Sequence, residues 1–164
     1  EAPRIAGAVS VFFLSGESAP VCSPALLRQH GNNSGDQVSV HPLELGLLHD
    51  GDMAGWKTWL EETGEVVKDA IPGATFEDFN LLRAAALSGQ GVALCPLAMV
   101  RPDLETGSLV QLSDHTISYG SDYYLVSKIA ADPVLAHQTR VFRDWALAES
   151  QALSQTFVSA SVPE

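Results

Sequence analysis

The sequence predicts a mixed α/β fold, because short apolar runs typical of strands alternate with capped, amphipathic helical segments along most of the 164 residues. Residues 74–96 are the clearest example, since Asp78 precedes a helical pattern that ends at Gly89. Residues 91–95 then form a short apolar run typical of a strand buried in a parallel sheet, and Pro96 ends it. Such a unit points the amino end of a helix toward the sheet edge at which α/β proteins usually bind ligands.

The segments before this unit follow the same alternation. Residues 9–14 are strand-like, and residues 21–22 continue as a short extended piece. Ser23 and Pro24 are expected to begin a helical turn, because serine caps helices and proline fits the first helical position. Residues 43–48 predict a further strand that ends in an acidic loop.

A helix with two tryptophans follows that loop. Asp52 is a suitable cap for it, and Trp56 and Trp59 lie on one face of the helical pattern. Tryptophans at this spacing are more often core residues, although a flat platform for a ligand is the alternative. Residues 66–74 predict an extended segment that leads into the central unit.

The remaining segments include the longest predicted helix. Two short helical turns are expected at residues 96–100 and 101–107, followed by strands at residues 109–112 and 123–126, the last of them buried. Asp132 and Pro133 then begin a helix with an apolar stripe, which consists of Val134, Val141, Phe142, Trp145 and Ala148.

The composition of the chain argues against several classes of function. The formal net charge of −11 argues against binding of a nucleic-acid backbone by this segment itself, because that requires a basic surface. No run approaches the roughly 20 apolar residues of a membrane helix, so no membrane span is expected, and no signal peptide is visible. Cys22 and Cys95 are expected to be buried free thiols, with a redox switch as the alternative.

The chain shows no motif that predicts catalysis or a cofactor. The GQG at residues 89–91 is too short for a nucleotide-binding loop, and no nucleophile is followed by a recognisable base. The spacings of the five histidines fit no common metal site. We therefore predict no cofactor, no metal and no enzymatic activity.

Acidic residues follow two of the predicted strands. Asp50 and Asp52 form one acidic loop, and Glu77 and Asp78 form another, each between a strand and a helix. Paired carboxylates can hold a cation or move protons. The alternative is that Asp52 and Asp78 are helix caps, and capping does not prevent contact with a ligand at the same edge.

Several sequence blocks together resemble the effector-binding domain of LysR-type transcriptional regulators, closest to the glycine-cleavage-activator and β-lactamase-activator subgroup. The blocks occur in family order from about residue 19 to residue 149: PVCSPALL, LLHDGDMAGWKTWL, the stretch F-x-D to AAALSGQGVALCP, DLETGSLVQL, YYLVS and VFRDWALAE. Each block alone is weak evidence, whereas their conserved order and spacing indicate the family.

This resemblance implies two lobes of the type-II periplasmic-binding-protein-like fold, with the second lobe complete and the first truncated. Residues 1–20 would be a remnant of the first lobe and a crossover, and residues 21–124 the second lobe. Residues 125–150 would be the other crossover and a helix that returns to the first lobe, and residues 151–164 a flexible tail. The exposed apolar stripe of that helix is then expected to drive self-association.

The resemblance also places an effector site at the strand ends and helix starts. The residues it implies are His49, Asp50, Asp52, Asp78, Phe79, Asn80, Cys95, Pro96 and Tyr124. Because so many carboxylates repel a dicarboxylate, an amino acid, a peptide or a neutral ligand is the expected effector.

The predicted function is that of a ligand-sensing domain in a cytoplasmic LysR-type transcription factor. DNA would be bound through a helix-turn-helix that is not part of this chain, and the regulator would be a homodimer or homotetramer. The alternative with the same architecture is a solute-binding protein of a transport system.

Overall fold

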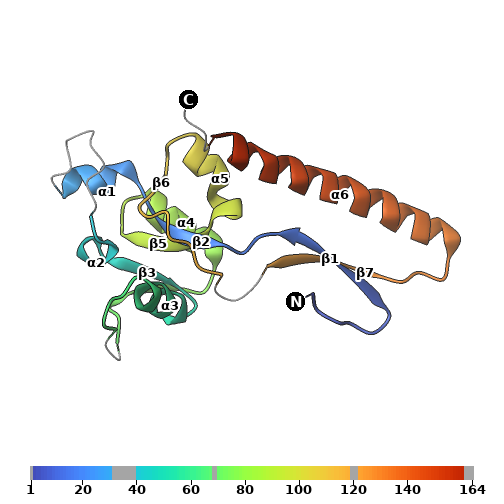
Figure 1. The fold of residues 1–164 in the computed structure, drawn as a ribbon, viewed down its shortest axis with the longest axis horizontal. Helices are drawn as coiled ribbons and strands as arrows, with labels where there is room; N and C mark the ends of the chain where they lie inside the picture. The colour runs from blue at the N-terminus through green and yellow to red at the C-terminus, as the bar shows by residue number, and fades with distance from the viewer. Residues whose placement is uncertain (1, 31–39, 68–69, 119–121, 161–164) are drawn as a thin grey trace. The chain divides into compact units, whose positions relative to one another are not determined.

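The computed structural model describes residues 2–30, 40–67, 70–118 and 122–160, and the chain divides into two compact units (Figure 1). The smaller unit combines Glu1–Gly16 with Ser121–Glu164, and the larger unit is Glu17–Gly120. Each unit is described by itself. Within the described ranges, no helix combines the length and the apolar character that crossing a membrane requires.

The larger unit is built on a mixed five-stranded sheet with the strand order β4-β3-β5-β2-β6. Its strands are β2 (Ser18–Cys22), β3 (Leu47–Asp50), β4 (Gly73–Phe76), β5 (Val92–Pro96) and β6 (Val110–Gln111). β3 is parallel to β4 and β5, whereas β2 is antiparallel to β5 and β6. The run at residues 91–95 therefore forms a buried central strand, with a parallel neighbour on one side and an antiparallel neighbour on the other.

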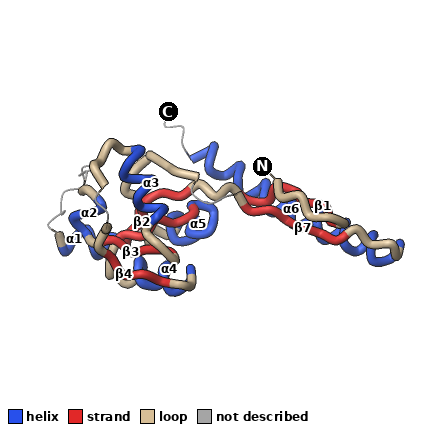
Figure 2. The backbone as a smooth tube through the Cα atoms, turned by 90° about the horizontal axis from the view of Figure 1, so that it is seen from below, coloured by secondary structure: helices blue, strands red, loops and turns tan. Residues whose placement is uncertain are grey.

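The described residues of this unit form five helices: α1 (Pro24–Gln29), α2 (Pro42–Leu45), α3 (Ala54–Glu62), α4 (Phe79–Leu87) and α5 (Leu97–Glu105). They cover both faces of the sheet (Figure 2). One core contains the apolar side of α4 and Val100 of α5, packed on alternate residues of β2, β3 and β5. The second core contains Trp56, Trp59 and Leu60 of α3, packed on the other residues of the same strands.

The helix caps predicted at Ser23 and Asp78 form in the structure. The Ser23 hydroxyl accepts a hydrogen bond from the Leu26 N–H at 3.3 Å, and Pro24 occupies the first helical position. Asp78 Oδ1 accepts from the N–H groups of Asn80 and Leu81 at 2.8 and 3.1 Å. These bonds satisfy N–H groups that have no partner within the helix, which fixes where each helix begins.

Two element predictions are wrong. Residues 43–48 were expected to form one strand, but Pro42 starts the short helix α2 and Gly46, with φ 81°, breaks it before β3 begins at Leu47. The two expected turns at residues 96–107 form the single helix α5, although Pro102 lies inside it. Val100 and Leu104 pack on the same core from either side of the proline, and this packing holds the helix continuous.

The smaller unit contains an antiparallel pair of strands and a long helix. β1 (Ala8–Leu14) pairs with β7 (Tyr123–Lys128), and α6 runs from Pro133 to Ala160. Asp132 caps α6 as predicted, since its Oδ1 accepts from Val134 N–H at 2.8 Å. The helix continues through residues 151–160, where the sequence predicts a flexible tail.

The expectation of a buried strand at residues 123–126 is wrong. Tyr123 and Val126 are exposed, and Tyr124 and Leu125 are half-buried. The reason is that β7 belongs to a sheet of two strands, which cannot enclose a strand in the way the larger sheet encloses β5.

Both cysteines are free and buried, as predicted. Cys22 packs in the core that contains the α3 tryptophans, and Cys95 packs in the core on the opposite face of the sheet. Burial raises the pKa of Cys22 to about 11 and that of Cys95 to about 12. The two thiols are therefore separated by the sheet and protonated at neutral pH, which excludes a redox switch between them in this fold.

Candidate functional site

The predicted acidic loops meet at the carboxyl ends of two parallel strands. Asp50 at the end of β3 is the register partner of Phe76 at the end of β4. The Gly51 N–H donates a hydrogen bond to the Phe76 carbonyl at 2.8 Å, which joins the two loops directly. Parallel pairing therefore brings together segments that are more than twenty residues apart in the sequence.

Two helices begin at this edge. Asp52 Oδ1 accepts from the Ala54 N–H at 2.8 Å at the start of α3, and Asp78 caps α4. The capping alternative therefore holds for Asp78, whereas the N-cap of α3 is Met53 and Asp52 lies one residue before it. Both helix starts face the region beyond the strand ends, where a polar ligand group would meet them.

The electrostatics of this edge are set by Asp50. Burial of its carboxyl raises its pKa above the ordinary value, and the negative charges of Asp52, Asp78 and Glu77 raise it further. Within the part of the chain that the structure describes, none of these carboxylates has an ion-pair partner. The site therefore carries uncompensated negative charge, which favours a ligand with a cationic group.

His49 and Cys95 do not belong to this surface. The His49 side chain is buried with 2% of its surface exposed, and its Nε2 lies 3.1 Å from the Ile71 carbonyl oxygen. Cys95 has no exposed surface. Alternation along β3 and β5 buries both side chains, so neither is exposed at the strand ends where the acidic loops meet.

The other residues that the family resemblance assigns to the effector site lie in different parts of the structure. Asn80 is exposed in the first turn of α4, and Phe79 is half-buried against the core below it. Pro96 is half-buried at the end of β5, opposite Ser18. Tyr124 lies in the smaller unit, where its ring makes an edge contact with Phe12 at a centroid distance of 6.1 Å.

The tryptophan pair of α3 is part of the core and not a ligand platform. Trp56 and Trp59 are 2% and 3% exposed, and their rings make an edge contact at 5.9 Å. Trp56 Nε1 donates to the Leu48 carbonyl at 2.8 Å. This bond ties α3 to the strand that carries Asp50, so the tryptophan positions the site without touching it.

The sequence analysis did not predict an ion pair that holds α4, one of the two helices that begin at this edge of the sheet. Arg83 of α4 donates to Asp103 of α5 through Nε and a terminal nitrogen, at 2.5 and 2.6 Å. The hydrogen bond to Asp103 raises the pKa of Arg83. The pair fixes α4, whose first turn carries Asn80, to α5. The two residues are twenty positions apart in the sequence, which hides this contact, because only the fold brings the two helices together.

Comparison with known proteins identifies the class. The family described as the LysR substrate binding domain matches residues 2–151, and the chain belongs to this family. It is 31% identical over 149 residues to the glycine cleavage system transcriptional activator of Escherichia coli K12, covering 84% of this chain and 44% of the activator. It is 32% identical over 115 residues to the transcriptional activator AmpR of Providencia stuartii, covering 68% of this chain and 38% of AmpR.

Solved structures give the same fold. The AmpR effector binding domain from Citrobacter freundii matches with a TM-score of 0.71 at 21% identity, over 94% of this chain and 72% of that one. The regulatory domain of CrgA from Neisseria meningitidis matches with a TM-score of 0.61 at 24% identity, over 90% and 72%. The predicted periplasmic-binding-protein-like α/β fold is thereby confirmed. The chain spans less than half the length of the curated relatives it matches.

Proposed function

We propose that this chain is the ligand-sensing part of a LysR-type transcriptional regulator, and that it binds a small cationic or zwitterionic effector at the carboxyl ends of β3 and β4. The observation that carries the proposal is the junction of two acidic loops at the sheet edge where α3 and α4 begin, in a chain of this family. Similarity to transcriptional activators supports regulation over solute transport and over catalysis.

The side chains at the carboxyl ends of β3 and β4 indicate the chemical class of the ligand. Asp50 and its acidic neighbours attract an amine, whereas the side-chain amide of Asn80 suits a carboxylate or amide oxygen. An amino acid or a short peptide carries both groups. A dicarboxylate would be repelled, so the proposed effector is an amino acid or peptide.

The whole regulator is proposed to work as follows. A helix-turn-helix outside this chain binds DNA, and the effector shifts an equilibrium between two arrangements of a cytoplasmic homo-oligomer because it binds them with different affinity. Residues 21–124 would form the second lobe, and residues 1–20 and 125–150 would be the crossovers and the part that belongs to the first lobe.

Calorimetric titration of the chain with L-alanine, L-alanyl-L-alanine and succinate tests this proposal. Asn80→Ala is expected to weaken binding of the zwitterions by about 1–3 kcal/mol, the cost of leaving a polar group of the bound ligand unpaired. Asp50→Asn is expected to lower affinity for the amine-bearing ligands and to spare a neutral, N-acetylated amide analogue. Gln90→Ala, an exposed amide at the other end of α4, is the matched control and should bind as the wild type does.

Asp50→Asn is expected to remain folded. The folded-state pKa of Asp50 lies above its ordinary value, so its ionised form lowers stability at neutral pH, and this penalty disappears as the pH falls through the raised pKa toward 3.8. Asparagine removes the penalty, and the variant should be at least as stable as the wild type to urea at neutral pH. If both site variants bind the zwitterions with wild-type affinity, the effector site lies elsewhere.

A further inference from the structure

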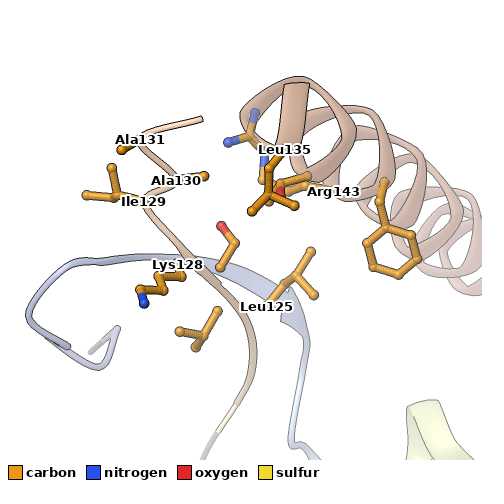
Figure 3. Close-up of a pocket in the computed structure, with 11 residues that line it drawn as sticks. Leu125, Lys128, Ile129, Ala130, Ala131, Leu135 and Arg143 are labelled. Carbon is orange, nitrogen blue, oxygen red and sulfur yellow. The ribbon is translucent and has the colours of Figure 1, made fainter. Parts of the chain in front are cut away.

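His49 carries the one buried side-chain atom, Nδ1, that lacks a hydrogen-bond partner in the part of the chain that the structure describes. A buried polar atom of this kind needs an explanation, because it has lost its contact with water. The groove of about 710 Å³ between β7 and α6 holds no such atom among the described residues, and its apolar side chains Leu135 and Phe142 are more than half exposed (Figure 3). His49 is therefore the buried group that still lacks a role.

The hydrogen bond at the other ring nitrogen fixes the tautomer of His49. Its Nε2 lies 3.1 Å from the Ile71 carbonyl oxygen, which can only accept a hydrogen bond, so Nε2 carries the proton. In the neutral ring, Nδ1 is then the unprotonated nitrogen. The donor of the ring is thus directed at the backbone just before β4 begins.

Gly73 leaves the space in which this ring lies. A Cβ atom at Gly73 would overlap the His49 ring and would lie 2.5 Å from the Leu47 carbonyl oxygen. Gly73 is not among the glycines with positive φ, so its backbone conformation does not itself require glycine. The close approach of the imidazole and of β3 therefore explains why the first residue of β4 has no side chain.

β4 is held against β3 at both of its ends. It is a four-residue strand at the edge of the sheet, and its residues Gly73–Thr75 are exposed. Before the strand begins, the Ile71 carbonyl accepts the hydrogen bond from His49. Where it ends, the Phe76 carbonyl accepts from the Gly51 N–H at 2.8 Å. So short an edge strand depends strongly on such contacts, because few buried groups hold it.

We propose that His49 is a positioning residue, whose bond to Ile71 fixes the register of β4 against β3 and thereby places Glu77 and Asp78 beside Asp50. The inference rests on the proposed function, since these are the carboxylates that would attract the amine of the effector. His49 is 2% exposed and does not itself touch the effector. It acts through β4, because a strand that slips or opens would separate the two acidic loops and lower the affinity.

Amide hydrogen exchange of Gly51 under native conditions measures this positioning without any ligand, because its N–H bonds to Phe76 at the end of β4. In His49→Asn the side-chain amide ends one bond nearer to Cβ and cannot reach Ile71, so the exchange rate of Gly51 should rise at least tenfold. His49→Gln places an N–H donor as many bonds from Cβ as Nε2 does, and it should restore the wild-type rate. Val100→Ala, which removes buried methyl groups from α5, is the control for general loss of stability and should leave the rate unchanged.

Gly73→Ala provides a second variant that leaves His49 in place. The added methyl group displaces the ring from Ile71, and the Gly51 amide should again exchange at least tenfold faster. Ala74→Ser, which adds an atom at the next exposed residue, is the matched control and should exchange as the wild type does. Circular dichroism checks that each variant is folded, and long-range ¹H–¹⁵N spectra of the wild-type ring should show a protonated Nε2 and an unprotonated Nδ1.

Titration with L-alanyl-L-alanine connects the positioning to binding. His49→Asn should bind the dipeptide at least tenfold more weakly than the wild type, and His49→Gln should bind it nearly as well. Wild-type exchange of Gly51 in either His49→Asn or Gly73→Ala would overturn the inference, and so would a His49→Gln variant that exchanges as fast as His49→Asn. A wild type that binds no zwitterion while the exchange rates change as expected would contradict the proposed ligand alone, and the positioning of β4 by His49 would stand.

Discussion

Trp56→Ala is expected to lower the free energy of unfolding of the larger unit by about 3–5 kcal/mol, the usual cost of removing a large aromatic side chain from a core. Trp56 is 2% exposed and touches the ring of Trp59 at its edge. Its removal also leaves the Leu48 carbonyl without the hydrogen bond from Nε1, which adds the cost of an unsatisfied buried acceptor.

Urea unfolding followed by circular dichroism measures this loss without relying on tryptophan fluorescence. Trp145→Ala is the control, because Trp145 is 56% exposed and belongs to the smaller unit. It should leave unfolding of the larger unit nearly unchanged. A loss below about 1 kcal/mol for Trp56→Ala would mean that α3 is not held to β3 as the structure describes, since surface substitutions usually cost no more than that.

Gly91→Ala is expected to have the second-largest effect, a loss of about 1–3 kcal/mol from overpacking. A Cβ atom at Gly91 would lie 2.7 Å from the Gly46 carbonyl oxygen and 3.0 Å from the Leu48 side chain. The same carbonyl accepts the Val92 N–H at 2.8 Å, so moving the backbone to relieve the clash weakens that bond.

The control for Gly91→Ala is Gln90→Ala, which changes the neighbouring exposed residue without adding an atom to the core. Its unfolding free energy should match that of the wild type. If Gly91→Ala is equally stable, the close approach of β5 to the Gly46 backbone does not exist in solution.

Local features of the fold could be predicted from the sequence because their causes are local. Ser23 and Asp78 mark helix starts through bonds to N–H groups three residues or fewer away. Trp56 and Trp59 indicate a buried helix face through their spacing alone. The meeting of the acidic loops followed from one general rule, that parallel strands end at the same edge.

Features that depend on strand pairing could not be predicted in the same way. Gly91 was interpreted as the first residue of an apolar strand run, whereas the structure shows its close approach to Gly46, a residue 45 positions earlier. His49 and Cys95 are buried because successive side chains of β3 and β5 point to opposite faces of the sheet. A shift of one residue in either strand would reverse which side chains point inward. The start of β3 was itself misplaced, because Pro42 begins the short helix α2 and Gly46 ends it before the strand starts at Leu47.

The central claim is that the effector binds where β3 and β4 end. Its most direct test is a titration of the ¹⁵N-labelled chain with L-alanine and with L-alanyl-L-alanine, with succinate as the dicarboxylate comparison, while the amide resonances are followed by NMR. The account predicts saturable shifts centred on Gly51, Asp52, Asn80 and Leu81 for the zwitterions, and none there for succinate. Saturable shifts confined to other residues, or tighter binding of succinate at this edge, would contradict it.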